Sequence, residues 1–304
     1  MGGLSSERDI STKSGTAVLD ALKSAGLNAV PLDVCDETEE EIRRLILTQA
    51  VDIVFVAMHG GFGEGGPLQH ILEKISIPYT GSREAASRLA MDKRVSRRFF
   101  KKAGLSVPRY RRRNRKMSRF LSKLFLIGWQ YPCVVKPSAQ GSSIGISFID
   151  SVANLEGALE HAFKYGDDVL VEEFIRGREI TVSVLDDQAL PIVEIIPKKK
   201  FFDFQAKYET GLTDYAVPAP LEASIAGKAQ KDAVSATRAL GCRHFSRVDM
   251  IVSAQGTPYV LEVNTIPGMT ATSLFPKAAA AAGINFSALC VRLLELALHD
   301  HGEK

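Results

Sequence analysis

The sequence has few cysteines, and they are too far apart to suggest a disulfide framework or a zinc site. Its 304 residues include only Cys35, Cys133, Cys242 and Cys290, with no CxxC pair among them. No apolar run of about 18 residues or more is present, so we expect no membrane span. The N-terminus lacks the basic and apolar leader of a signal peptide. These absences predict a cytoplasmic protein with reduced thiols.

Acidic residues are absent from positions 93–123, which hold 14 lysines and arginines. The rest of the chain has 24 basic against 35 acidic residues, and the whole chain carries a net charge of +3. A basic stretch of this kind is typical of nucleic-acid binding. Aromatic residues are sparse in it, so we favour a solvated linker and helix face with one or two lysines turned toward a phosphate ligand. We therefore expect no nucleic-acid partner.

The order of predicted elements indicates an α/β protein. Helical spacing over 11–26, 37–49 and 68–75 alternates with apolar segments at 29–33 and 51–58 that fit buried parallel strands. No G-x-G-x-x-G motif follows a strand, which excludes a dinucleotide-binding dehydrogenase. No apolar strand precedes Gly2-Gly3, so we expect either that the start of the chain is mis-assigned or that the first strand of the sheet is absent. Farther along we predict strands at 133–136, 144–149, 168–174, 179–185 and 192–196, and helices at 92–103, 120–128, 152–165, 223–240 and 286–298.

The most informative segment is a predicted β-hairpin formed by Ser246–Val252 and Pro258–Asn264. A two-residue turn at Gln255-Gly256 places Asp249 opposite Glu262 and Arg247 opposite Asn264. Strand alternation puts these four side chains on one face. The other face is apolar and is expected to lie against a core; it carries Val248, Met250, Val252, Tyr259, Leu261 and Val263.

The acidic face of this hairpin predicts a metal site. Opposed carboxylates, with Cβ atoms about 5 Å apart, repel each other unless a cation lies between them. Oxygen ligands from Asp, Glu and Asn suit Mg²⁺, which usually binds beside substrate phosphates. The alternative is an exposed charged face that only keeps the sheet soluble.

A loop rich in glycine and serine runs from Lys136 to Gly145, between two predicted strands. Its small residues let backbone N–H groups and hydroxyls approach phosphate oxygens closely. The spacing differs from GxxxxGK[ST], so it is not a Walker A loop. The acids that end strand 168–174 fit an adenosine pocket, and the segment after Asn264 offers N–H groups and Ser273 to an oxyanion. Each pattern alone also fits a plain polar loop or a solvated strand end.

In order and spacing, these motifs resemble the D-alanine–D-alanine ligase family of the ATP-grasp superfamily along essentially the whole chain. The matching stretches are Gly2-Gly3-Leu4-Ser5-Ser6-Glu7-Arg8, His59-Gly60 with Gly63-Glu64-Gly65-Gly66, Met91-Asp92-Lys93, Lys136 to Gly145, Ala206-Lys207-Tyr208, Arg247-Val248-Asp249 and Glu262 to Leu274. The resemblance implies an α/β (α+β) ATP-grasp fold, with an N-terminal α/β domain at 1–92 and two α+β domains at 93–177 and 178–304 that clamp ATP. It also implies a homodimer that ligates two D-alanines for peptidoglycan through a D-alanyl phosphate, using ATP and two Mg²⁺ or Mn²⁺ ions.

The resemblance implies a role for each matching residue. The nucleotide would be bound by Lys93, Lys136 and Lys207 at the phosphates, by Ser142 and Ser143 in a mobile loop, and by Glu172, Glu173, Ile175 and Glu179 at the adenosine. The metal ligands would be Asp249, Glu262 and Asn264. The substrates would meet Glu7 at the first ammonium, Ser273 and Leu274 at the second carboxylate, and Arg247 with the N–H of Gly268 at the oxyanion. Tyr208, Ser142 and Glu7 would close a loop over the site, and His59 is either on the substrate side or satisfied by backbone.

Two other interpretations of the sequence stay open. A ligase with another second substrate, such as a D-alanine–D-lactate ligase, would share these motifs, although relatives of that kind tend to carry Phe where this chain has Tyr208. A weakly active homologue or an RNA-binding scaffold would instead use the basic stretch 93–123, and salt-dependent nucleic-acid binding without ATP turnover would identify it.

Overall fold

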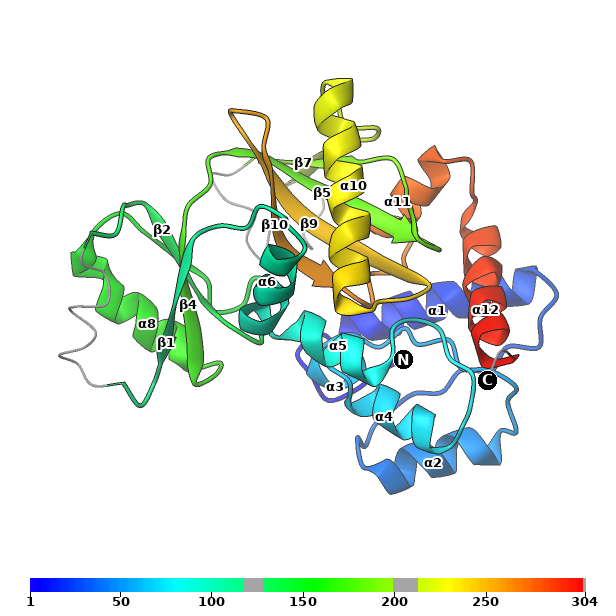
Figure 1. Ribbon diagram of the computed structural model, residues 1–304. Coiled ribbons are helices and arrows are strands. Elements are labelled where there is room, and N and C mark those ends of the chain that lie inside the picture. Colours follow the sequence, from blue (N-terminus) through cyan, green and yellow to red (C-terminus); the bar gives the residue numbers. More distant parts are fainter. Residues whose placement is uncertain (118–127, 199–212, 303–304) are drawn as a thin grey trace.

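Two antiparallel sheets hold the strands of this protein. The computed structural model describes residues 1–117, 128–198 and 213–302. The smaller sheet has the strand order β1-β4-β2-β3 and lies at one end of the molecule; the larger has the order β10-β9-β5-β7-β8, with β6 beside β5, and lies in the middle (Figure 1). The strands are β1 (Tyr110–Asn114), β2 (Cys133–Pro137), β3 (Ser147–Ile149), β4 (Asp168–Glu173), β5 (Gly177–Leu185), β6 (Gln188–Ala189), β7 (Val193–Pro197), β8 (Thr213–Ala216), β9 (Phe245–Ser253) and β10 (Pro258–Asn264).

Helices surround the larger sheet and cover the smaller one. They are α1 (Arg8–Ser24), α2 (Glu39–Thr48), α3 (Gly61–Glu64), α4 (Pro67–Lys74), α5 (Glu84–Met91), α6 (Lys93–Lys102), the 3₁₀ turn η1 (Val152–Asn154), α8 (Leu155–Phe163), α10 (Ala223–Leu240), α11 (Leu274–Ala281) and α12 (Phe286–Gly302). Asp92 caps α6 by accepting a hydrogen bond from the N–H of Arg94, and Gly241 ends α10 with a φ of +71°. Among the described helices none is long and apolar enough alone to cross a membrane; α11 and α12 pass that test only together, bent by 101°.

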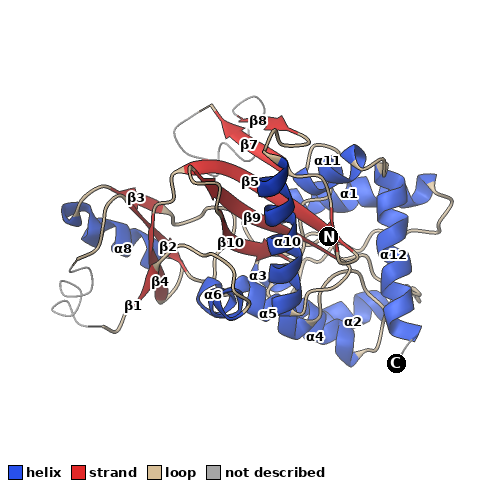
Figure 2. Ribbon diagram, turned by 45° about the horizontal axis from the view of Figure 1, so that its top comes forward, coloured by secondary structure: helices blue, strands red, loops and turns tan. Residues whose placement is uncertain are grey.

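One face of each sheet is buried under a helix (Figure 2). α8 packs on the smaller sheet, where Val135, Val169 and Val171 are buried with Leu155 and Leu159. α10 packs on the larger sheet, with small residues facing the strands; the buried residues there include Ala229, Ala233, Ala236, Ile180, Val182, Val248 and Met250. Because alternate strand residues face opposite sides, Thr181, Arg247 and Asp249 are directed away from α10.

The hairpin of β9 and β10 has the predicted register at its acidic face but not at its turn. Asp249 pairs with Glu262 and Arg247 with Asn264, as predicted. Nearer the turn the register shifts by one residue, because a β-bulge lies between Val260 and Glu262. The N–H of Ser253 bonds to the carbonyl of Thr257, so the loop is longer than the predicted two-residue turn. The predicted core face is accordingly wrong in part: Val260 is fully buried, whereas Tyr259 and Leu261 are only half-buried.

The strands predicted over 29–33 and 51–58 are not formed. Only isolated parallel bridges occur there, between Gly2 and Val34 and between Val54 and Tyr79. A groove lined by both segments separates them, and a parallel strand needs a hydrogen-bonded neighbour to extend beyond a bridge. The surrounding helices still bury an apolar cluster, which includes Ile42, Val56, Met58, Leu68, Ile71 and Leu72.

Part of the basic stretch forms a strand that the sequence patterns do not predict. β1 pairs antiparallel with the acidic strand β4. Arg112 lies 2.6 Å from Asp168, Arg109 lies 2.7 Å from Glu173, and Arg115 lies 2.8 Å from Asp167. The predicted solvated linker is therefore an ordered strand whose charge is largely matched by its neighbour. The helix predicted over 120–128 falls outside the described residues, apart from Gly128.

Candidate active site

A cavity of about 700 Å³ lies where the starts of α1 and α6 meet the ends of β9 and β10. Its walls come from segments that are far apart in the sequence. The lining residues include Glu7, Lys13, His59, Glu64, Lys93, Gly141, Ser142, Arg247, Asp249, Glu262, Asn264, Gly268, Ser273 and Leu274. The structure thus gathers most of the predicted substrate and metal residues around one space.

The acidic face of the hairpin is held by two cations. The Arg247 guanidinium donates two hydrogen bonds of 2.8 Å to the Asp249 carboxylate. The Thr181 hydroxyl donates a third hydrogen bond to Asp249, with a length of 2.7 Å. The ammonium of Lys93, at the first turn of α6, lies 2.9 Å from Glu262. Opposed carboxylates repel each other, so positive charge from outside the acid pair is what stabilises this arrangement.

A second ion network, buried beside the first, joins the smaller sheet to α6. Lys136 of β2 and Arg97 of α6 both lie 2.9 Å from the same oxygen of Glu172 on β4. The Arg97 side chain is fully buried and also donates to the carbonyl of Leu261 in the β10 bulge. Burial lowers the pKa of Lys136 to about 8, although the Glu172 carboxylate works in the opposite direction. The sequence motifs do not single out Arg97, because its partner is 75 residues away.

The glycine- and serine-rich loop is docked against α1 and α6. The Ser142 hydroxyl donates to the Glu7 carboxylate at the start of α1. The ammonium of Lys93 donates to the carbonyl of Gln140 at 2.7 Å, and the N–H of Lys93 donates to the carbonyl of Ser138 at 2.8 Å. Ser142 and Ser143 both have left-handed backbone conformations, with φ of +52° and +59°. Such strained positions cluster at ligand-binding loops, which fits the predicted phosphate contact.

His59 is buried and its ring is held by side chains. Nε2 lies 3.0 Å from the hydroxyl of Ser14, and Nδ1 lies 3.1 Å from a carboxylate oxygen of Glu64. The Ser14 hydroxyl also accepts a hydrogen bond of 3.3 Å from the N–H of Met269. The interpretation in which backbone groups satisfy the ring is therefore wrong. The ring lines the cavity and connects α1 to the loop that follows β10.

That loop, from Thr265 to Ser273, forms the far wall of the cavity. Asn264 accepts a hydrogen bond of 2.9 Å from the N–H of Ile266, which turns the chain sharply after β10. Ser273 accepts from the N–H of Thr270 at 3.1 Å and stands at the N-cap position of α11. A Cβ at Gly268 would lie 2.9 Å from the Ser273 hydroxyl, so only glycine lets these two segments approach so closely.

Two family profiles match this chain. The profile described as D-ala D-ala ligase C-terminus matches residues 99–295, and the profile described as D-ala D-ala ligase N-terminus matches residues 35–82. This chain belongs to the D-alanine–D-alanine ligase family. The D-alanine–D-alanine ligase of Geobacter sulfurreducens is 45% identical over 97% of this chain and 91% of the relative. That of Pelotomaculum thermopropionicum is 44% identical over 99% of this chain and 96% of the relative.

Solved members of the ligase family have the same fold. The D-alanine–D-alanine ligase of Bacillus anthracis in complex with ATP is 34% identical, with a TM-score of 0.87 over 100% of this chain and 96% of that one. The VanG D-Ala:D-Ser ligase from Enterococcus faecalis is 30% identical, with a TM-score of 0.84 over 98% of this chain and 97% of that one. The predicted ATP-grasp fold is therefore confirmed.

Several residues that the family resemblance assigns to the nucleotide do not line this cavity. Glu172 is buried with Lys136, and Glu173 binds Arg109 through both its oxygens. Ile175 is half-buried in the connection from β4 to β5, and Glu179 is half-buried near the start of β5. Lys207 and Tyr208 lie outside the described residues. The structure thus brings the substrate and metal residues together and sets the adenosine residues apart, beside the junction of the sheets.

The predicted metal ligands fit a ligase site by their chemistry. Across the described residues, no three of His, Cys, Asp and Glu gather in a way that could hold a metal ion. The predicted set is two acids and one amide, so it needs oxygens from a bound phosphate to complete a metal's shell. In this structure the Lys93 ammonium neutralises Glu262, and the Arg247 guanidinium neutralises Asp249. The two carboxylates therefore need a positive charge at this position.

Proposed function

We propose that this protein is an ATP-dependent ligase that joins two molecules of D-alanine into D-alanyl-D-alanine for peptidoglycan synthesis in the cytoplasm. One observation carries the proposal: a single cavity combines an acid–amide set, two ion-paired cations and a glycine-bearing loop on separate chain segments. That combination suits a reaction that brings phosphates and carboxylates together. The residues that we assign to each step of the reaction are chosen by their place around this cavity and by the family resemblance.

The nucleotide phosphates are bound by lysines that the serine loop covers. We assign Lys93, Lys136 and Lys207 to the phosphate oxygens, and Ser142 with Ser143 to the loop that closes over them. Lys93 now binds Glu262 and Gln140, so it can exchange these partners for a phosphate without moving to a new part of the protein. Glu172, Glu173, Ile175 and Glu179 are assigned to the adenosine.

The acidic face of the hairpin would hold divalent cations. Asp249, Glu262 and Asn264 would bind two Mg²⁺ or Mn²⁺ ions, since these oxygen donors suit hard cations. When bound, the ions neutralise the phosphate oxygens during phosphoryl transfer. Arg247 and Lys93, which now neutralise the two acids, would turn toward the substrates' oxygens.

The two D-alanines lie between α1 and the loop after β10. The Glu7 carboxylate, held by the Ser142 hydroxyl, is placed to bind the ammonium of the first D-alanine. Ser273 and Leu274, at the start of α11, are placed to bind the carboxylate of the second. His59, fixed by Ser14 and Glu64, orients the first substrate from the side of α1.

The reaction then has two steps. The first carboxylate attacks the γ-phosphorus of ATP, which gives D-alanyl phosphate and ADP. The neutral amine of the second D-alanine attacks the acyl carbon. The tetrahedral intermediate then breaks its C–O bond to phosphate, and the leaving phosphate takes one proton of the amine, which leaves the peptide bond. Arg247 and the N–H of Gly268 stabilise the oxyanion of that intermediate. The loop with Ser142 excludes water, because the acyl phosphate would otherwise hydrolyse.

The direct test is phosphate release from ATP with D-alanine as the sole amino acid, together with mass spectrometry of the product. We expect release and D-alanyl-D-alanine with D-alanine, and neither with L-alanine. A solved relative is a D-Ala:D-Ser ligase, so D-serine and D-lactate are offered as second substrates in parallel. Equal release with both enantiomers, or a mixed product that exceeds the dipeptide, would contradict the assignment.

The division into domains at residues 92 and 177 and the homodimer stay proposals. The apolar clusters support the first of these only in part, because one cluster includes Phe100, Leu105 and Val107 together with β5, β9 and α10. Light scattering during size-exclusion chromatography tests the dimer, and a monomeric mass would reject it.

A further inference from the structure

Helix α1 buries two serines at positions where the helical spacing calls for apolar side chains. Ser11 and Ser14 precede the core residue Val18 at intervals of three and four residues, on the buried face of the helix. Neither serine has any exposed surface. A buried hydroxyl is unfavourable unless it is hydrogen-bonded, so both serines need partners on the segments that pack against α1.

The two hydroxyls bind different groups. Ser11 accepts a hydrogen bond of 2.8 Å from the backbone N–H of His59. Ser14 lies 3.0 Å from Nε2 of the His59 ring, and it also accepts a hydrogen bond of 3.3 Å from the N–H of Met269. Met269 directly follows Gly268, whose N–H we assign to the oxyanion. Ser14 therefore links the His59 ring to the loop that carries the proposed oxyanion donor.

The hydrogen bonds of Ser14 have a definite direction. The backbone N–H of Met269 can only donate, so the Ser14 oxygen accepts that bond. Among the described residues, Nε2 of His59 is the only hydrogen-bond partner of the Ser14 hydroxyl that can accept its hydrogen. A proton on Nε2 would leave this hydroxyl hydrogen buried without an acceptor, which is unfavourable. Nε2 is therefore the nitrogen that carries no proton.

The proton of the neutral ring is then on Nδ1 of His59. Nδ1 lies 3.1 Å from a carboxylate oxygen of Glu64, which accepts the bond. All these bonds thus run in one direction, from the loop after β10 through α1 to Glu64. Both ring nitrogens are occupied, so His59 presents only its carbon edge to a substrate. The polar group that reaches the wall of the cavity is the Glu64 carboxylate.

We propose that Ser14 is a positioning residue of the ligase, which fixes His59 as the neutral Nδ1–H tautomer and holds the loop after β10 through the same oxygen. Ser14 lies outside the cavity lining and acts only through the groups that it binds. This tautomer directs an N–H at Glu64, so the wall offers carboxylate oxygens to the cavity. Only the effect of Ser14 on catalysis rests on the proposed function.

The test of the tautomer is ¹⁵N NMR of the full chain with labelled histidine, in which His59→Gln identifies the signals of His59. At neutral pH we expect a proton on Nδ1 and none on Nε2. In Ser14→Ala the Nε2 signal should shift, because this nitrogen loses its hydrogen-bond donor. Amide hydrogen exchange at Met269 should become about tenfold faster or more in the same variant.

Ser11→Ala is the matched control. Ser11 lies on the same buried face of α1 and also loses a hydrogen bond, but it touches neither ring nitrogen nor Met269. We expect both variants to lower Tm by similar amounts, whereas only Ser14→Ala changes the Nε2 signal and the exchange at Met269. Ser14→Ala should also lower kcat about fivefold, the effect of one neutral hydrogen bond, with KM for ATP unchanged.

Three outcomes would overturn the proposal. A proton on Nε2 in the unsubstituted protein would do so without any variant, so the proposal can be tested even if Ser14→Ala does not fold. Unchanged exchange at Met269 in Ser14→Ala would break the link to the loop after β10. The same Nε2 shift in Ser11→Ala would show a general loosening of α1. Phosphate release with D-alanine is measured separately, so the expected tautomer without release would reject only the proposed function.

Discussion

At the residue scale, Arg247 has one observed contact and one proposed role, and it cannot serve both at the same moment. Its guanidinium holds Asp249 with two hydrogen bonds, and the proposed mechanism needs the same group at the oxyanion. In the proposed mechanism the arginine would serve as the counterion of Asp249 until the substrates bind.

Replacing Arg247 by alanine should separate these two functions. Losing one oxyanion donor costs roughly 3–4 kcal/mol, so we expect kcat to fall at least a hundredfold while KM for ATP changes little. Arg247→Lys keeps the charge but not the two-pronged geometry and serves as the matched control, with an intermediate loss. Steady-state kinetics measures both, and unchanged kcat in Arg247→Ala would remove this residue from the mechanism.

The lowered pKa of Lys136 predicts a pH dependence of nucleotide binding. Below a pH of about 8 its ammonium is charged, and above that value the free protein has lost the charge that a phosphate needs. Affinity for ATP should therefore decrease as pH rises from about 7.5 to about 9.5, and binding in that range should take up a proton. Calorimetry in buffers of different ionisation enthalpy measures the uptake; its absence would mean that Lys136 does not meet the phosphates.

Arg97 is the residue that the sequence motifs miss. It is fully buried, and removing one partner of a buried ion network typically costs about 3–5 kcal/mol. We expect Arg97→Met to lower stability by that amount in denaturant unfolding. It should also raise the pKa of Lys136, because the guanidinium is one of the charges that depress it. Adding Glu172→Gln should not recover the lost stability, since Glu172 is also the partner of buried Lys136 at 2.9 Å.

At the element scale, local sequence patterns are sufficient to predict the helices. The registers and bulges of the strands depend on residues that are distant in the sequence. The helix over Ala223–Leu240 ends at Gly241, whose left-handed φ ends the helix. The helical spacing of its apolar residues is sufficient to predict it. The alternation of β9 and β10 predicts the opposed pair Asp249 and Glu262. The bulge at Leu261 is not predictable from that pattern, and the Leu261 carbonyl accepts a hydrogen bond from Arg97 of another element.

The same limit applies to the basic stretch. Its arginines suggest a free cationic surface when the sequence is considered alone, whereas β1 aligns them with the acids of β4. Arg112 and Arg94 share Asp168, and the Arg112 partner lies 56 residues away in the chain. A charge count over a window cannot detect such a distant partner.

The serine loop, from Ser138 to Gly145, is the element that we propose closes over the substrates. The Ser142 hydroxyl donates a hydrogen bond to the carboxylate of Glu7, the N-cap residue of α1. We expect Ser142→Ala to raise KM for the first D-alanine about tenfold and to speed amide exchange across 139–145. Ser143→Ala is the matched control, because its neighbour keeps the bond to α1. Equal effects of the two substitutions would contradict a specific Ser142–Glu7 contact.

At the scale of the whole molecule, a buried histidine ties the C-terminal helix to the N-terminal region. Nδ1 of His244 accepts from the N–H of Gly81 at 3.1 Å, and Nε2 lies 3.2 Å from Asp300 on α12. Protonation of Nδ1 would break the bond to Gly81. Burial, with help from the Arg243 charge, lowers the pKa of His244 to about 4.

This pKa predicts a loss of stability in mild acid. The unfolded chain binds a proton near pH 6.5, whereas the folded chain resists it down to about pH 4, so stability falls as pH decreases through that window. We expect Tm to decrease between about pH 7 and about pH 5. His244→Asn, which tolerates the left-handed φ of +60° at this position, should flatten that slope. A slope that is the same in both proteins would assign the acid sensitivity to other groups.

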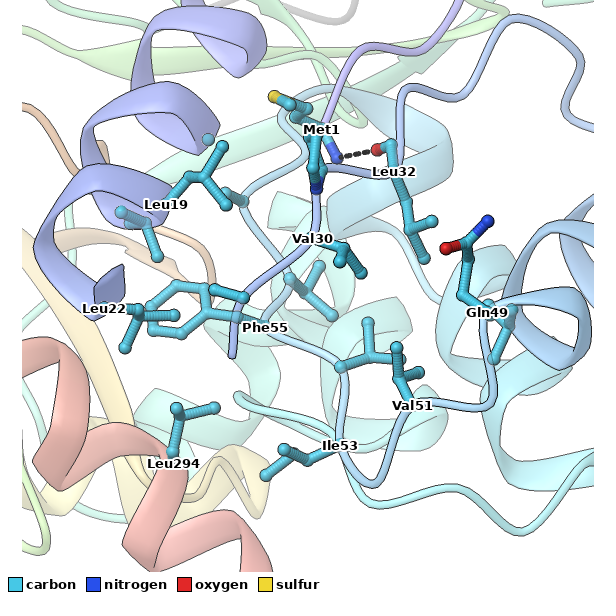
Figure 3. Close-up of a pocket in the computed structure, with 18 of the residues that line it drawn as sticks. Met1, Leu19, Leu22, Val30, Leu32, Gln49, Val51, Ile53, Phe55 and Leu294 are labelled. Carbon is cyan, nitrogen blue, oxygen red and sulfur yellow. Dashed lines mark hydrogen bonds between the residues drawn. The ribbon is translucent and has the colours of Figure 1, made fainter. Parts of the chain in front are cut away.

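Helix α1 is a common wall of the candidate active site and of the apolar groove that the segments 28–34 and 51–58 line (Figure 3). Glu7, Ile10 and Lys13 face the candidate active site, whereas Val18, Leu19 and Leu22 face the apolar groove. If α1 moves as a rigid body, a small hydrophobic compound bound in the groove beside Leu19 would displace the Glu7 carboxylate at the start of the same helix. Such a compound would be an inhibitor that mimics neither nucleotide nor amino acid, and resistance to it would arise by substitutions far from the catalytic residues.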